Sequence, residues 1–248
     1  MLLVTELRIG IDVGGTGIKG AIVDVSTGDL KSDRFRLETP RPATVESVVA
    51  TVASVVESLD HPGPIGVGFP AVLVHGVAST ANNIHHGWIG TDVAGTISQA
   101  TGREVSLVND ADAAGLAEAS FGAARGVAGK VLVLTFGTGI GSALMMDGVL
   151  VPNFEFGQIE FEGVRPAELE FSARAREDLG LDWDEWGDRT ARYLEMVDTV
   201  VNPDLMVFGG GACKEWEHFH KRIPPGLNVV QAQLLNNAGI VGASLVAG

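Results

Sequence analysis

The stretch RIGIDVGGTGIKG, residues Arg8–Gly20, decides the fold that we expect for this chain. Apolar residues enter it, glycines interrupt it and a second apolar run leaves it, which predicts a strand, a turn and a strand. Glycines let backbone N–H groups approach an anion, while Thr16 adds a hydroxyl and Lys19 a positive charge. The residues that we expect to contact phosphate are Asp12, Gly14, Gly15, Thr16, Gly17 and Lys19. A plain hairpin turn is the alternative interpretation of the same glycines.

A second stretch, Val131–Leu150, has the same form as the first. An apolar run again enters a glycine turn and an apolar run leaves it, so we interpret the two stretches as an internal repeat. The residues of this turn that we expect to contact phosphate are Thr135, Gly137, Thr138, Gly139 and Gly141. Each repeat would head one half of the chain, and we expect the two halves to face each other across a phosphate-binding cleft.

Composition limits the classes of function. The 248 residues carry 31 acidic side chains against 17 lysines and arginines, a formal net charge of −14, which argues against nucleic-acid binding. No apolar run approaches the roughly 20 residues of a membrane helix, and the apolar N-terminus is too short for a signal peptide. Cys213 is the only cysteine, so we expect neither a disulfide nor a thiolate zinc cluster. These features predict a cytoplasmic protein.

Hydrophobic periodicity predicts an α/β chain. Valines and a leucine recur at helical spacing over Thr44–Asp60, with Thr44 as N-cap. Further helices are expected over 92–101, 166–179 and 183–200 and after Ala212. Further strands are expected over 31–37, 64–74, 104–108 and 204–211, the last of which runs into three glycines. We predict a small domain over residues 1–109 and a large domain over residues 110–234, with a C-terminal helix, about 235–248, packing back on the small domain.

Asn109 and Asp110 lie where a predicted strand ends and a predicted helix begins. A helix N-terminus stabilises a carboxylate in its ionised form, which is the form that a general base needs. The alternative is that Asp110 only caps the helix.

Taken in order, these segments resemble the ROK family of sugar kinases, and in particular its polyphosphate glucokinase and polyphosphate/ATP glucomannokinase group. The matching runs include GIDVGGTGIKG, NDADAAGLAE, LTFGTGIGSA and NNAGIVGA, and the resemblance extends from about residue 8 to the C-terminus. It implies the actin-like, ribonuclease H-like ATPase fold, with two domains around a cleft. It further implies a homodimer, and, like that group, the chain lacks the cysteines of the zinc motif that most ROK members carry.

The resemblance also implies the reaction and the roles of residues. The chain would transfer a terminal phosphoryl group from polyphosphate or ATP to the 6-hydroxyl of glucose, with Asp110 as the general base and Mg²⁺ held by Asp12 through water. The glycines implied to face the nucleotide are Gly209, Gly210 and Gly211. The residues implied to bind the sugar are Asn83, Asn109, Asp110, Glu155, Gln158 and Glu168.

One position departs from the family. The family pattern is Glu-x-Gly-His, whereas this chain has Glu155-Phe156-Gly157-Gln158, and glutamine cannot become cationic. Two alternatives therefore stand beside the polyphosphate kinase: a strictly ATP-dependent ROK hexokinase, and a sugar-binding sensor without catalysis. Another activity of the actin-like superfamily, such as acetate kinase, is disfavoured by the sugar-type residues.

Overall fold

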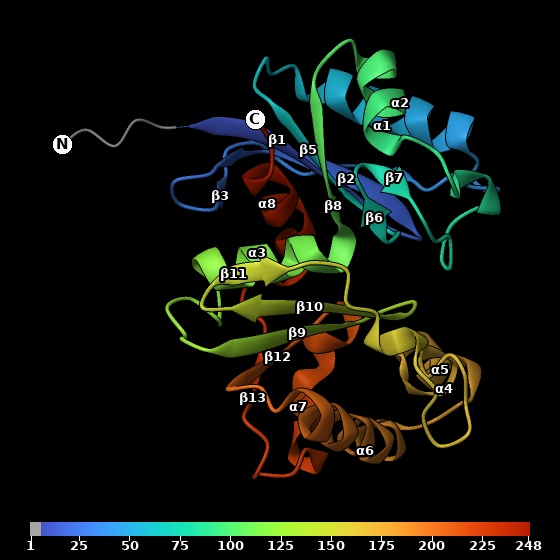
Figure 1. The fold of residues 1–248 in the computed structure, drawn as a ribbon, viewed down its shortest axis with the longest axis vertical. Coiled ribbons are helices and arrows are strands. Elements are labelled where there is room, and N and C mark those ends of the chain that lie inside the picture. The colour runs from blue at the N-terminus through green and yellow to red at the C-terminus, as the bar shows by residue number, and fades with distance from the viewer. Residues whose placement is uncertain (1–5) are drawn as a thin grey trace. The chain divides into compact units, whose positions relative to one another are not determined.

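The computed structural model describes residues 6–248, which divide into two compact units (Figure 1). The first unit comprises the described residues up to Ala117 together with Asn237–Gly248, and the second comprises Glu118–Asn236. The chain passes from one unit to the other within helix α3 (Asp110–Phe121) and again before helix α8 (Ala238–Leu245). No helix among the described residues is long and apolar enough to span a bilayer.

The first unit is built on a six-stranded sheet in the order β3-β2-β1-β5-β8, with β4 also paired to β2. Its strands are β1 (Leu7–Val13), β2 (Gly17–Asp24), β3 (Asp29–Leu30), β4 (Phe35–Glu38), β5 (Ile65–Phe69) and β8 (Val105–Asn109). Strands β1 and β2 are antiparallel and joined by the first glycine stretch, while β1, β5 and β8 are parallel. The strand expected over 31–37 is interrupted, because only Phe35–Glu38 pairs along β2.

Helices α1 (Val45–Leu59) and α2 (Val93–Thr101) cover the sheet of the first unit. The apolar face of α1 is buried and Thr44 caps its N-terminus, as the sequence predicts. Two short strands, β6 (Leu73–Val74) and β7 (Val77–Ala78), and the 3₁₀ turn η1 (His86–Trp88) lie between β5 and α2. Trp88 is fully buried against Phe69, with ring centroids 4.6 Å apart.

Helix α8 packs on β1 and β5 through backbone contacts. A methyl group added to Gly10 would collide with the carbonyl of Ile240, and one added to Gly66 would collide with the carbonyl of Ala243. Glycine is therefore required on the sheet so that the helix can approach this closely.

The second unit has a five-stranded sheet in the order β11-β10-β9-β12-β13. Its strands are β9 (Lys130–Phe136), β10 (Ile140–Met146), β11 (Val149–Val151), β12 (Leu205–Gly209) and β13 (Val229–Gln231). Strands β9 and β10 are antiparallel, and β12 runs parallel to β9. The first unit pairs β1 with β2 and β5 in the same senses, so the predicted repeat is present in the structure.

The helices of the second unit follow the second glycine stretch. They are α4 (Glu168–Phe171), α5 (Ala173–Asp178), α6 (Trp183–Val201) and α7 (Trp216–Phe219), with 3₁₀ turns η2 (Phe156–Gln158), η3 (Gly211–Glu215) and η4 (His220–Arg222), and η5 (Leu235–Asn237) leads into α8. The single helix expected over 166–179 is divided at Ser172, whose extended backbone ends α4 and whose hydroxyl caps α5. The helix expected after Ala212 begins as the 3₁₀ turn η3.

Candidate active site

The first glycine loop joins β1 to β2, and side chains of β4 and of the residue after it donate hydrogen bonds to its carbonyls. Within the loop, the N–H of Gly14 donates to the carbonyl of Gly17 over 3.1 Å. The Thr39 hydroxyl donates to the Gly14 carbonyl over 2.5 Å, and the Arg36 guanidinium donates to the Thr16 carbonyl over 2.8 Å. Among residues 6–248, nothing accepts from the N–H groups of Gly15 and Thr16, and both residues are exposed. The carbonyls are thus occupied while these donors stay open to an anion.

Arg36 and Thr39 have no distinctive sequence signature, and they were not predicted. Their place at the loop depends on the register of β2 and β4, in which Lys19 lies opposite Arg36 and Gly17 opposite Glu38. A Cβ on Gly17 would lie 2.5 Å from the Arg36 Nε, so a glycine there leaves room for the guanidinium.

Asp12 lies at the end of β1, beside the first glycine loop. Its carboxylate accepts a hydrogen bond from the Lys19 ammonium over 3.2 Å, and both side chains are largely buried. A Cβ on Gly239, at the start of α8, would lie 2.9 Å from the Asp12 Cγ. The C-terminal helix therefore packs directly against this carboxylate.

Asp110 follows β8 as the first residue of α3. Burial, and then the nearby Asp12 carboxylate, raises the pKa of Asp110 to about 7. The same group accepts a hydrogen bond from the N–H of Ala111 over 2.9 Å, which opposes part of that rise. A carboxyl with a pKa near neutrality is suited to accepting a proton during a reaction.

Asn109 caps α3. Its side-chain oxygen accepts from the N–H groups of Ala111 (2.9 Å) and Asp112 (3.1 Å), and its amide donates to the Ala71 carbonyl over 3.1 Å. Asn109 is buried, and one amide hydrogen is left over for a ligand. Asn109 therefore provides most of the capping of α3, which was the alternative role that the sequence suggested for Asp110.

The second glycine loop resembles the first in its hydrogen bonding. The N–H of Gly137 donates to the carbonyl of Gly139 over 3.0 Å, and the Gly137 carbonyl accepts from the N–H of Arg174 over 3.0 Å. Within the described chain, no group accepts from the N–H of Thr138 or Gly139. Thr135 lies opposite Gly141 in the register of β9 and β10, at the base of the loop.

Gln158 and Glu168 form a hydrogen-bonded pair in the second unit. The Gln158 amide donates to Glu168 Oε1 over 2.8 Å, and Glu168 Oε2 accepts from the N–H of Ile140 over 3.0 Å. Ile140 is the first residue after the second glycine loop, so Glu168 connects Gln158 to that loop. Glu155 directly precedes η2, and η2 packs on β10. The approach is so close that a Cβ on Gly157 would collide with the Ile140 carbonyl.

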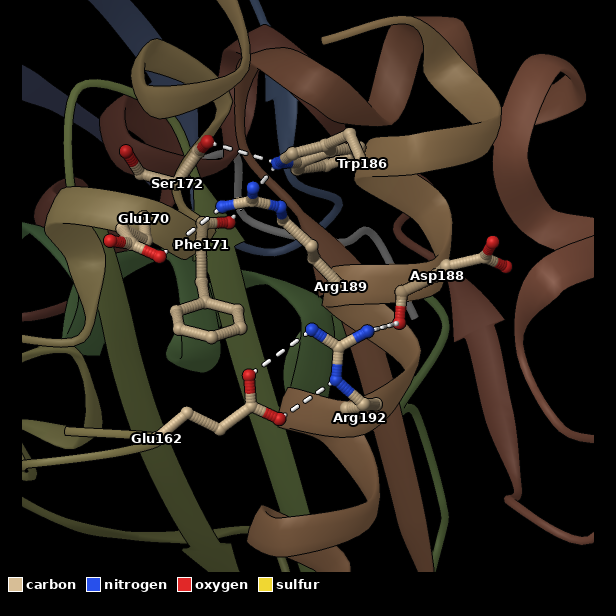
Figure 2. A network of polar contacts seen from close by, with 8 residues as sticks. All are labelled: Glu162, Glu170, Phe171, Ser172, Trp186, Asp188, Arg189 and Arg192. Atoms are coloured by element: carbon tan, nitrogen blue, oxygen red, sulfur yellow. Dashed lines mark hydrogen bonds and ion pairs between the residues drawn. The ribbon is translucent and has the colours of Figure 1, made fainter. Parts of the chain in front are cut away.

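The segment 162–172, which contains Glu168, is anchored to α6 (Figure 2). The Trp186 indole N–H is shared between the carbonyls of Phe171 (3.2 Å) and Ser172 (3.0 Å). Arg189 reaches Glu170 over 3.3 Å, and Arg192 binds both carboxylate oxygens of Glu162. Helix α6 thereby fixes both ends of the segment that positions Glu168.

The glycine triplet Gly209–Gly211 follows β12 and packs on the base of the second glycine loop. Gly210 has a φ of 80°, and a Cβ there would lie 2.5 Å from the backbone nitrogen of Phe136. Both the positive φ and the close approach require glycine.

Asn83 lies in the first unit, where it is exposed and lines a surface hollow together with Gly15.

Each unit therefore gathers one group of the predicted site residues. The first unit brings together Asp12, the first glycine loop, Lys19, Asn109 and Asp110. The second unit brings together the second glycine loop, Gln158, Glu168 and the glycine triplet.

A comparison with known families places this arrangement. The model of the ROK family matches residues 8–152. The chain belongs to the ROK family. Within the ROK family it is 44% identical to a polyphosphate glucokinase of Mycobacterium tuberculosis over 237 residues, covering 95% of this chain and 89% of that one. It is 41% identical to a polyphosphate glucokinase of Mycobacterium leprae, covering 95% of this chain and 73% of that one.

Solved structures of ROK proteins share the fold. The inorganic polyphosphate/ATP-glucomannokinase of Arthrobacter sp. strain KM matches with a TM-score of 0.94 and 47% identity, covering 97% of each chain. A ROK glucokinase of Streptomyces griseus matches with a TM-score of 0.82 at 24% identity, covering 97% of this chain and 99% of that one. The fold is thus the α/β, actin-like fold of the ROK sugar kinases, as the sequence predicts.

Proposed function

We propose that this chain is a polyphosphate glucokinase, which transfers the terminal phosphoryl group of inorganic polyphosphate, and of ATP, to the 6-hydroxyl of glucose. The observation that carries the proposal is the 44% identity to a polyphosphate glucokinase along nearly the whole chain. The geometry within each unit supports it, because both glycine loops present unpaired N–H groups and Asp110 has the pKa of a general base.

In the proposed reaction, the 6-oxygen of glucose attacks the terminal phosphorus while the bridging P–O bond to the rest of the donor breaks. Asp110 accepts the proton of the hydroxyl, and the shortened polyphosphate or ADP leaves. Phosphoryl transfer depends mainly on positioning and on stabilising charge. The N–H groups of Gly15, Thr16, Thr138 and Gly139 would supply that stabilisation, with Lys19 beside the first loop.

Mg²⁺ fits the residues of the first unit. Asp12 and Asp110 are close enough for one carboxylate to raise the pKa of the other, so a cation beside them would relieve their repulsion. No cluster of three or more histidine, cysteine or acidic side chains suited to a metal occurs in residues 6–248. Mg²⁺ commonly uses one or two carboxylates together with substrate phosphates, so Asp12, through water, would suffice. The ion would neutralise the donor phosphates.

The sugar would be held by Asn83, Asn109, Glu155, Gln158 and Glu168. Gln158 and Glu168 already form a fixed pair, and Asn109 retains one amide hydrogen. Gln158, which stands where the family has a histidine, donates a hydrogen bond to Glu168 without adding charge. This contact supports a functional sugar site. It therefore argues against the alternative of a degenerate sensor.

The test measures glucose 6-phosphate formation with Mg²⁺ from polyphosphate and from ATP in parallel, for the wild type and for Asp110→Asn. We expect turnover with polyphosphate, and a loss of about 10²- to 10⁴-fold in kcat in the variant. Turnover with ATP alone would make the chain an ordinary hexokinase. Sugar binding without turnover from either donor would support the sensor.

A further inference from the structure

One face of α6 packs against the segment that carries Glu168. Four residues share this face at spacings of i, i+3, i+4 and i+7, namely Trp186, Arg189, Thr190 and Tyr193. Trp186 and Arg189 contact the residues that follow Glu168 on the segment, as Figure 2 shows. Thr190 and Tyr193 therefore face the same segment.

The ring of Tyr193 contacts both parts of the second unit that Glu168 joins. It stacks on Phe171, which lies one turn after Glu168 on α4, with ring centroids 5.7 Å apart. It also packs edge-on against Phe136, the residue before the second glycine loop, with centroids 6.1 Å apart. Glu168 connects α4 to the same loop through the N–H of Ile140. Tyr193 thus lies against the two elements that this hydrogen bond holds together.

The hydroxyls of Tyr193 and Thr190 have no hydrogen-bond partner among residues 6–248, although both side chains are fully buried. Burial, and then the negative charge of Glu168, raises the pKa of Tyr193, so the phenol keeps its proton and can donate it in a hydrogen bond. A buried hydroxyl without a partner costs stability, so such groups are normally bonded to protein or to ordered water. The two hydroxyls therefore mark a polar point within an aromatic cluster, near the Glu168 carboxylate.

The Glu168 carboxylate can accept more hydrogen bonds than the two described above. Its oxygens together offer roughly four acceptor positions, and the Gln158 amide and the Ile140 N–H occupy two of them. Positions therefore remain for a sugar hydroxyl and for one further donor from the protein side.

We propose that Tyr193 is a positioning residue for the sugar site, and that its hydroxyl holds the Glu168 carboxylate through one buried water that Thr190 also contacts. Such a water would join three polar groups, and a buried water makes about three hydrogen bonds. A carboxylate that is held from α6 in this way is already ordered before the sugar arrives, which lowers the entropic cost of binding. This inference rests on the proposed function, in which Glu168 binds the sugar.

The first test is Tyr193→Phe, which removes the hydroxyl and keeps the ring. We expect the Kd for glucose, measured by calorimetry without a donor, to rise about three- to tenfold. The KM for glucose should rise by the same factor while kcat changes little, because the hydroxyl does not touch the reacting atoms. The midpoint of urea unfolding should fall. An unchanged Kd for glucose would overturn the proposal, and so would a higher midpoint, because removing a hydroxyl that has no partner relieves its desolvation cost.

A double-mutant cycle with Glu168→Gln tests whether Tyr193 acts through Glu168. We expect Tyr193→Phe to raise the Kd for glucose by less than about twofold once the carboxylate has been replaced. The same cycle on the free energy of unfolding gives the coupling when the double variant binds glucose too weakly to measure. Effects of the two substitutions that combine independently in both measurements would show a merely structural role for Tyr193 and would overturn the proposal.

Thr190→Val and Thr199→Val form a matched pair, because each removes a hydroxyl from α6 and keeps the shape of the side chain. Thr199 is exposed, and its hydroxyl donates to the Glu195 carbonyl over 2.9 Å. We expect Thr190→Val to raise the Kd for glucose in the same direction as Tyr193→Phe, and Thr199→Val to leave it unchanged. Equal effects of the two would show a general response of α6 and would contradict the shared water.

These measurements separate this inference from the proposed function. Failure of the proposed function would appear as a wild type that binds glucose without phosphoryl transfer. Failure of this inference would appear as wild-type affinity for glucose in Tyr193→Phe. The urea midpoint needs neither sugar nor donor, so it tests the hydrogen bond of the Tyr193 hydroxyl independently of the reaction.

Discussion

Asp110 is buried beside Asp12, and the resulting pKa of about 7 fixes the sign of two pH effects. A general base must be deprotonated, so kcat/KM should rise with pH and level off above the pKa of Asp110, which is about 7 without Mg²⁺ and lower once Mg²⁺ offsets the Asp12 charge. A pH profile of kcat/KM at saturating Mg²⁺ measures this. A kcat/KM that stays constant between about pH 5 and 8 would argue against Asp110 as the base.

The same pKa makes Asp110 unfavourable for folding at neutral pH. The folded-state pKa lies above the ordinary value of 3.8, so the folded protein holds the proton more tightly than the unfolded chain. The contribution of Asp110 to stability is therefore complete below about pH 4 and is lost as the pH rises through about 7. The asparagine of Asp110→Asn is uncharged at every pH in this range. The variant should therefore become more stable relative to the wild type as the pH rises from about 4 to about 7. Urea denaturation of both proteins at several pH values tests this expectation.

Gln158 acts on the sugar site through Glu168. Gln158→Ala removes one of the two direct hydrogen-bond donors to the Glu168 carboxylate described above. The loss should weaken the binding free energy of the sugar by about 1–2 kcal/mol. We expect the KM for glucose to rise about tenfold, with a smaller rise in the KM for the donor because Glu168 also holds the Ile140 N–H. Glu170→Ala, which removes the partner of Arg189 on the same short helix, serves as the control. A rise of equal size in the control would show a general loosening of α4 instead.

At the scale of elements, the packing of α8 depends on glycines in the sheet. Gly66→Ala would place a methyl group against the Ala243 carbonyl, and a backbone carbonyl cannot move aside as a side chain can. We expect a loss of about 2–3 kcal/mol in the free energy of unfolding. Gly226→Ala, where a Cβ meets nothing within 4 Å, should change stability little. A small effect of Gly66→Ala would mean that α8 shifts easily on β1 and β5.

The elements also show how far sequence alone reaches. Strong periodicity gave α1 within one residue at each end, and the glycine stretches gave both β–loop–β units. The division of α4 from α5 was missed, because a serine that caps a helix looks the same in sequence as a serine within one. Arg36, Thr39 and the Gln158–Glu168 pair depend on strand register and on contacts distant in sequence, which periodicity does not encode.

At the scale of the whole molecule, net charge and local charge act over different distances. At about 0.01 M ionic strength the Debye length is about 30 Å, so an approaching polyphosphate experiences the repulsion of the full charge of −14. At about 0.1 M the Debye length is about 10 Å, and the donor experiences mainly the groups around the first glycine loop. We therefore expect kcat/KM for polyphosphate to rise between these salt concentrations, at constant saturating Mg²⁺, and to fall at about 1 M, where the local contacts are screened as well. Glucose is neutral, so its KM should stay constant up to about 0.1 M and provides the control within the same protein. A continuous fall in kcat/KM from the lowest salt, as for a basic polyanion-binding protein, would show that local cations outweigh the net charge at every distance.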